Sequence, residues 1–164
     1  MIVVSDATPL RHLIAIGRID LLQALFGKVI VPTAVLSELR HDSTPALIRT
    51  WIDMPPGWVQ VLTPSHSNLP GGGSGLDPGE KEAICLALEL KADLLLIDER
   101  AGREYALDLN LPVTGTLGLL EQADVEGLIS DLPVTLTELK ASGFFVSGRL
   151  MDAVLQRWRE RRKP

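Results

Sequence analysis

The sequence contains little cysteine, few aromatic residues and no long apolar run. Cys85 is the single cysteine among 164 residues, so the chain can form neither an internal disulfide nor a cysteine-based zinc site. Cys85 lies in a helical pattern and is expected to be a small core residue. Aromatic residues make up only 4% of the chain, but 46% hydrophobic and 23% charged residues are typical of a globular protein and exclude disorder over most of the length.

Segments that direct a chain to a membrane are also lacking. No apolar run approaches the roughly 18 residues of a membrane span. The first ten residues carry Asp6 in place of a basic stretch, so we expect no signal peptide, no membrane contact and a cytoplasmic location. The length suits one domain with a substantial core. We therefore expect a single domain over residues 1–164, with a helical C-terminal part at about 128–163.

Basic residues are outnumbered by acidic ones except at the C-terminus. The formal net charge is -5, yet residues 157–164 hold five basic residues and one Glu. Without that segment the chain has 11 basic and 20 acidic residues, a net charge of -9. An acidic body with a basic tail fits a metal-dependent nuclease whose tail meets phosphate. It fits equally a helix that ends in solvent with cations favoured by its dipole.

Short apolar runs alternate with helical patterns along the chain. The expected strands cover residues 1–5, 28–31, 58–62, the apolar run before Asp98, and 111–114. The expected helices cover residues 10–16, 19–26, 33–40, 46–54, two segments within 76–103, then 117–123, 135–141 and 147–162. Strands that alternate with helices predict a parallel sheet covered on both faces. The fold class expected is therefore three-layer α/β/α with a mostly parallel sheet.

Two further features of the sequence are not expected to carry chemistry. The glycine-rich segment at residues 63–75 lacks the Gly-Lys-Ser/Thr of a phosphate loop and is interpreted as a surface loop. His12, His41 and His66 show no metal-ligand spacing and are expected on the surface. The candidate chemistry therefore rests on carboxylates.

Carboxylates follow two of the expected strands. Asp6 and Asp98 each come directly after an apolar run, and ligands of an open parallel sheet bind beyond the carboxyl ends of its strands. Glu38 and Glu80 each lie on a helix near such a strand, Glu38 three residues after Val35 on an otherwise apolar face. Magnesium and manganese take oxygen ligands from carboxylates, waters and substrate phosphates. These four acids predict a site for a divalent cation.

Each carboxylate also has a structural interpretation. Asp6 and Asp98 precede helices and could be N-caps. The segment from Asp77 to Glu80, with Pro and Gly between, has the layout of a capping box. Helical spacing places Glu80 on a small apolar stripe that should face the sheet, whereas Glu82 lies on a mixed stripe. Glu80 is the preferred third acid, and Glu82 remains the alternative.

Several short motifs occur in an order that resembles a known family. They are Asp6-Ala7-Thr8-Pro9-Leu10, Val31-Pro32 with Val35 and Glu38, Gly79-Glu80 with Glu82-Ala83-Ile84 and Leu86-Ala87, Asp98-Glu99-Arg100 with Arg103, and Gly115-Thr116-Leu117-Gly118. Together they resemble the PIN-domain nucleases. The match is to the bacterial and archaeal branch of small PIN proteins, which is similar to toxins of type II toxin–antitoxin pairs.

The resemblance implies a magnesium- or manganese-dependent endoribonuclease that hydrolyses RNA. Its metal-binding acids would be Asp6, Glu38, Glu80 and Asp98. The supporting residues would be Thr116 through hydrogen bonding, Glu99 behind the ligands, Glu82 as the rival third acid, and Arg103 in contact with substrate or an acid. An antitoxin protein is the implied partner.

A homodimer is also expected, because apolar residues on the first helices exceed what one sheet face needs. These residues are Leu13, Ile14, Leu21, Leu22, Leu25 and Phe26. Two other functions compete with the nuclease. One is a catalytically inactive PIN-like module that binds RNA or protein, and the other is a structural α/β protein whose acids are only helix caps and do not converge.

Overall fold

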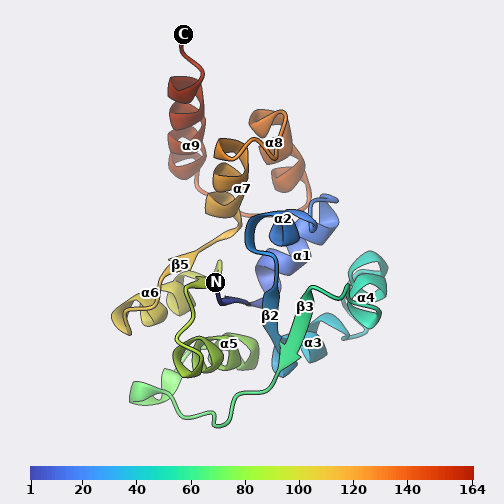
Figure 1. The fold of residues 1–164 in the computed structure, drawn as a ribbon, viewed down its shortest axis with the longest axis vertical. Coiled ribbons are helices and arrows are strands. Elements are labelled where there is room, and N and C mark those ends of the chain that lie inside the picture. Colours follow the sequence, from blue (N-terminus) through green and yellow to red (C-terminus); the bar gives the residue numbers. More distant parts are fainter.

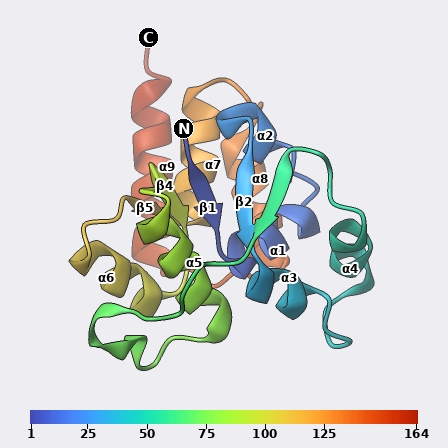
Figure 2. The same ribbon diagram turned by 60° about the horizontal axis from the view of Figure 1, so that its bottom comes forward.

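Five strands form one parallel sheet, which lies between the helices of the protein (Figures 1 and 2). The computed structural model describes residues 1–164. The strands have the order β3-β2-β1-β4-β5, and every neighbouring pair is parallel. Their bounds are Val3–Ser5 (β1), Val29–Pro32 (β2), Val59–Leu62 (β3), Leu94–Leu96 (β4) and Val113–Thr114 (β5). The first strand of the sequence is therefore the central strand of the sheet.

Helices cover both faces of the sheet, which confirms the three-layer α/β/α fold (Figures 1 and 2). The helices are α1 (Ala7–Ala15), α2 (Leu21–Phe26), α3 (Thr33–Leu39), α4 (Ala46–Asp53), α5 (Pro78–Glu89), α6 (Arg100–Asp108), α7 (Thr116–Val125), α8 (Leu132–Ala141) and α9 (Gly148–Arg161). Helices α5 and α6 pack on one face, and α1, α2, α7 and α8 pack on the other. One 3-10 turn, η1 (Pro70–Gly73), lies in the glycine-rich loop. No helix has the length and apolar character needed to cross a membrane.

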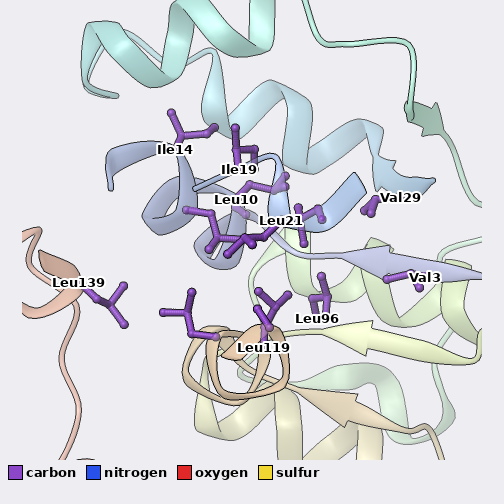
Figure 3. Close-up of a cluster of buried hydrophobic side chains, with 14 of the residues drawn as sticks. Val3, Leu10, Ile14, Ile19, Leu21, Val29, Leu96, Leu119 and Leu139 are labelled. Carbon is purple, nitrogen blue, oxygen red and sulfur yellow. The ribbon is translucent and has the colours of Figure 1, made fainter. Parts of the chain in front are cut away.

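Successive side chains of each strand point to opposite faces of the sheet, so the strands contribute to two separate apolar layers. Val3 and Leu96 point into the layer that contains α1 and α7, as Figure 3 shows. Their neighbours Val4 and Leu95 point into the layer that contains α5. All four side chains are buried. Because both faces of the sheet are apolar, polar side chains that approach the strands must do so at the strand ends.

Two helices begin earlier than the sequence pattern predicts. Helix α1 begins at Ala7 because Pro9 occupies its first turn, where the missing N–H is not needed. Helix α8 begins at Leu132 because the side chain of Asp131 accepts a hydrogen bond from the Val134 amide at 3.2 Å. Start signals therefore extend both helices beyond their amphipathic repeat.

Ion pairs fasten the C-terminal helix α9 to α7. Arg157 donates two hydrogen bonds to Glu121, at 2.7 and 2.9 Å. Arg161 pairs with Glu121 at 3.2 Å and with Asp124 at 2.9 Å, and Arg162 reaches Asp124 at 3.3 Å. Most of the basic tail is therefore engaged by acids of the same chain. The arrangement fits a docked helix better than a free phosphate-binding tail.

Apolar residues of the first two helices are used inside the chain. Leu13, Ile14, Leu21 and Leu22 are buried in the larger apolar layer, and the side chains of Leu25 and Phe26 pack against it. Figure 3 shows Ile14 and Leu21 in this layer. These residues leave no large apolar face for a second copy of the protein. The homodimer stays a prediction that rests on the family resemblance.

Candidate metal centre

Asp6 lies at the centre of an acidic cluster on the carboxyl edge of the sheet. It follows the central strand β1 directly and is only 2% exposed. It occupies the N-cap position of α1, but its side chain makes no capping hydrogen bond. Its buried Oδ1 has no hydrogen-bond partner at all. The cap interpretation of Asp6 is therefore wrong, and an unpaired buried oxygen of this kind requires another explanation.

Glu38 reaches the same point from α3. A Cβ atom placed on Gly79 would lie 3.3 Å from Oε2 of Glu38 and 3.4 Å from Oδ1 of Asp6. The two carboxylates therefore meet over a residue that has no side chain. Glu38 itself is exposed, in contrast to the buried Val35 and Leu39 of the same helix. The prediction that Glu38 lies on the apolar face was wrong, since it approaches the cluster from the rim.

Glu80 occupies the first turn of α5 and is buried, at 5% exposure. Its amide donates to Oδ1 of Asp77 at 2.7 Å, so Asp77 caps the helix as the sequence predicts. The Glu80 carboxylate, however, makes no return bond to the Asp77 amide. Its Oε2 lies instead 3.3 Å from the position that a Cβ of Gly102 would take. The side chain of Glu80 thus points into the protein, between α5 and α6.

Glu82, the alternative third acid, has a structural task. Its Oε1 accepts a hydrogen bond from the Ala34 amide at 2.9 Å, in the first turn of α3. That amide has no partner within its own helix, because the first N–H groups of a helix are free. Glu82 therefore caps α3 from a neighbouring helix. The pKa of Glu80 is raised by burial and, among other charges, by that of Asp6, which shows that the two carboxylates interact.

Asp98 is held by two hydrogen bonds from one residue. The Thr116 amide donates to Oδ1 at 2.7 Å, and the Thr116 hydroxyl donates to Oδ2 at 2.6 Å. Thr116 is buried and begins α7, so its amide is a free N–H at the positive end of that helix. Asp98 was considered as a possible cap of the helix that follows it, α6. It caps α7 instead, and the predicted hydrogen-bonding role of Thr116 has a defined geometry.

Gly115 allows the carboxylate of Asp98 to lie against the backbone. A Cβ atom there would come within 2.6 Å of Oδ1 of Asp98, which is closer than real Cβ contacts allow. We expect Gly115→Ala to displace Asp98 and lower the activity of the site about 10- to 100-fold, as loss of ligand support does in metal sites. Gly57→Ala, at a glycine with open space around it and no left-handed backbone conformation, is the matched control for chain folding. Equal activities of the two variants would contradict this role of Gly115.

Arg103 and Glu99 lie at the edge of the cluster. The Nη1 atom of Arg103 lies 3.3 Å from the position that a Cβ of Gly115 would take. Burial raises the pKa of Asp98, and the positive charge of Arg103 opposes part of that rise. The side chain of Arg103 is exposed and forms no ion pair or hydrogen bond. Glu99 is also exposed, and its charge raises the pKa of Glu80. Both residues therefore influence the charges of the cluster from its exposed edge, whereas Asp6 and Glu80 form its buried part.

Burial and mutual repulsion raise the proton affinity of the cluster. Burial, above all, raises the pKa of Asp6 from 3.8 to about 7. The carboxylates of Asp77, Glu38 and Asp98 add to this shift. Burial likewise raises the pKa of Glu80, Glu38 and Asp98, although the bonds from Thr116 oppose the shift at Asp98. Negative charge at this edge is therefore costly unless a cation offsets it.

The residues present suit a divalent cation. The structure contains no group of three or more Asp, Glu, His or Cys side chains close enough together to coordinate one metal ion. The unpaired Oδ1 of Asp6 and the space over Gly79 nevertheless offer oxygen ligands and room, which hard cations prefer.

Sequence reasoning missed two neighbours of the cluster. Asp77 is more than a helix cap, because its charge raises the pKa of Asp6, Glu38 and Glu80 alike. The sequence signal for this proximity is the spacing of three residues between Asp77 and Glu80, which places both in the first turn of α5. His12 is not a free surface residue: it is half-buried, stacks edge-to-face on Phe144 at 4.9 Å, and responds to the charge of Asp98. No spacing in the sequence signals this second contact.

The parallel sheet and the acids at its carboxyl edge define an α/β protein with an acidic site at the strand ends. The family model described as PIN domain matches residues 2–160. The chain belongs to the PIN-domain family, whose members are generally metal-dependent nucleases. This confirms the resemblance seen in the motifs.

One solved structure illustrates the shared fold. It is a PilT N-terminus domain protein, SSO1118, from the archaeon Sulfolobus solfataricus P2, with a TM-score of 0.54 and 21% sequence identity. The similarity covers 75% of this chain and 93% of that one. No curated protein matches the chain. At this identity the likeness concerns the fold alone.

Proposed function

We propose that the protein is a metal-dependent endoribonuclease that hydrolyses RNA phosphodiester bonds with Mg²⁺ or Mn²⁺. The observation that carries the proposal is the buried Asp6. Its Oδ1 has no hydrogen-bond donor, and the charges of nearby carboxylates act on it. Such a group costs folding free energy unless it binds something positive. Asp6, Glu38, Glu80 and Asp98 are the proposed metal-binding acids.

The residues of the chain have distinct tasks in this proposal. Asp6 and Asp98 leave adjacent strands, so the sheet fixes the distance between their backbones. Thr116 fixes the carboxylate of Asp98, and Glu80 and Glu38 close the site from two helices. A bound divalent cation supplies Lewis-acid stabilisation of charge on phosphate oxygens and activation of water as the nucleophile.

The third acid provides the sharpest test, because two glutamates lie only two residues apart on different faces of α5. We expect Glu80→Gln to lower Mg²⁺-dependent RNA cleavage about 10²-fold or more, as loss of a central electrostatic group does. We expect Glu82→Gln to change cleavage less than about tenfold, because its remaining oxygen can still accept the Ala34 bond. Cleavage of a labelled RNA is measured with Mg²⁺, with Mn²⁺ and with EDTA. Activity that survives both EDTA and Glu80→Gln contradicts the proposal.

We propose further that the protein is the toxin of a toxin–antitoxin pair, restrained by an antitoxin protein and acting as a homodimer. The support is the resemblance of the motifs from Asp6 to Gly118. Expression of the wild-type chain should then slow growth, and Glu80→Gln should remove the effect. If cells that express an active nuclease grow normally, the protein is not a toxin. Light scattering that finds a monomer at micromolar concentration would exclude the dimer.

A catalytically inactive RNA- or protein-binding module is the second candidate. The observation that favours it is the absence of a ready metal shell among the acids. Calorimetry separates the two functions, since the nuclease must bind Mg²⁺ and the module need not. Heat of Mg²⁺ binding that disappears in Glu80→Gln supports the nuclease, whereas no heat in the wild-type protein supports the module.

A further inference from the structure

A cleft extends from the acidic cluster along the C-terminal helices. It has a volume of about 580 Å³, which is within the range of specific ligand sites. It is lined by Asp98 and Arg103, by residues of α7, by the α8–α9 connection and by α9. The cleft therefore adjoins a proposed metal ligand.

The most exposed aromatic ring of the protein stands on this cleft. Phe145 is 95% exposed, and Leu150 beside it in the cleft wall is 56% exposed. The preceding residue, Phe144, is anchored by its edge-to-face contact with His12 at 4.9 Å and 88°. The connection is thus fixed at Phe144 while the ring of Phe145 stays open to solvent. Such a ring gains free energy by stacking on a flat partner.

Phe145 also faces the acidic cluster from a second side. A smaller hollow of about 300 Å³ is lined by Thr8, His12 and Glu99, and it shares Asp98 and Phe145 with the larger cleft. Phe145 therefore stands between two hollows that both open onto Asp98. A flexible chain bound at Asp98 would pass this ring in either direction.

The charges of the cleft favour a phosphate-bearing partner. Arg157 is neutralised by Glu121, at 2.7 and 2.9 Å. Arg100 is paired with Glu104 at 2.9 Å. Arg103 is the one arginine of the cleft that forms no ion pair or hydrogen bond, although its charge acts on the nearby Asp98. An apolar protein partner would remove its guanidinium from water without compensation, whereas a phosphate pairs with it directly.

We propose that this cleft holds the nucleotides next to the cleaved bond of a single-stranded RNA, with one base stacked on Phe145 and one backbone phosphate on Arg103. The inference rests on the proposed nuclease function and adds to it a substrate-positioning residue, Phe145. Duplex RNA does not fit, because its bases are already stacked on one another and cannot lie on the ring. Base stacking on an exposed aromatic ring tolerates many sequences, so Phe145 should contribute affinity more than sequence choice.

The test measures binding separately from cleavage. Fluorescence anisotropy of a labelled single-stranded RNA of twelve mixed nucleotides is followed with the full chain carrying Glu80→Gln, in Mg²⁺. We expect Phe145→Ala to weaken binding about tenfold and Phe145→Trp to restore it, since one stacked base is worth roughly that factor. Met54→Ala is the matched control, because Met54 is 84% exposed and lies outside the cleft. It should leave binding unchanged.

Two further measurements test the phosphate contact of Arg103 and the preference for a single strand. We expect Arg103→Ala to lower the slope of log affinity against log salt by about 0.7, the value for one phosphate contact to a single strand. A duplex of the same sequence should bind more weakly and should not respond to Phe145→Ala.

Several results would overturn the inference. They are equal affinities of Phe145→Ala and Met54→Ala for the single strand, an equal effect of Phe145→Ala on the duplex, and loss of a dimer in Phe145→Ala with unchanged RNA affinity. Failure of the nuclease looks different. The wild-type protein would then not cleave RNA, while the anisotropy still reports whether binding depends on Phe145.

Discussion

Replacing Asp98 with asparagine is expected to lower the rate of RNA cleavage about 10²- to 10³-fold, while the protein stays nearly as stable as the wild type. The reason is that Asp98 has two tasks. Its oxygens accept the bonds from Thr116 that begin α7, and its charge contributes to the proposed metal site. Asparagine keeps an oxygen for the Thr116 amide, and its NH₂ group can donate to the Thr116 hydroxyl. Only the charge is lost.

Two further variants separate these tasks. Asp98→Ala removes both, so it should lose activity and also about 1 kcal/mol of stability, as loss of a helix cap does. Thr116→Val keeps the charge but removes one bond to it, and we expect a loss of about 10- to 100-fold in activity. Cleavage rates and denaturant midpoints are measured for all three variants. Full activity of Asp98→Asn in Mg²⁺ would remove Asp98 from the proposed site.

Asp6→Asn is expected to abolish cleavage and yet to stabilise the metal-free protein at pH 8. The pKa of Asp6 is raised from 3.8 to about 7, so the folded protein holds this proton more tightly than the unfolded chain does. Stability of the wild type should therefore fall as pH rises from about 4 to about 7, and the full cost applies above 7. Asparagine cannot ionise and avoids that cost. A pKa difference of this size corresponds to a few kcal/mol.

Denaturation in EDTA at pH 5 and pH 8 measures this difference. The wild type should be more stable at pH 5, and the gap between the two pH values should shrink in Asp6→Asn. Mg²⁺ should stabilise the wild type at pH 8, because it binds the folded acids and not the unfolded chain. It should stabilise Asp6→Asn much less. A wild type that becomes more stable between pH 5 and pH 8 without metal would contradict the burial of Asp6 as a charge.

The sequence predicted the fold well because the information lay in local patterns. Short apolar runs alternating with helical repeats identify a parallel sheet, and the largest errors of bounds are the starts of α1 and α8, each three residues late. Asp6 and Asp98 could be placed at one edge because both follow strands, and the carboxyl ends of parallel strands share an edge. Glu80 could be separated from Glu82 because the two positions lie on different faces of α5.

Other parts of the site depend on contacts between elements, which local patterns do not specify. That Glu82 caps α3 follows from the packing of α5 against α3 and not from its spacing. Glu38 looks inward by helical periodicity, yet it is exposed and bends back over Gly79. The basic tail suggests phosphate until Glu121 and Asp124 are found beside it. In each case the partner is distant in sequence, and only the folded chain brings it close.

The central position of β1 determines when the site can exist during synthesis. Val4 of β1 pairs with Ile30 on one side and with Leu95 on the other. One edge of the first strand therefore stays open until more than half of the chain has left the ribosome. Parallel pairings over such separations form slowly. Asp6 is made at the start and Asp98 near residue 100, so the acids come together only late in synthesis.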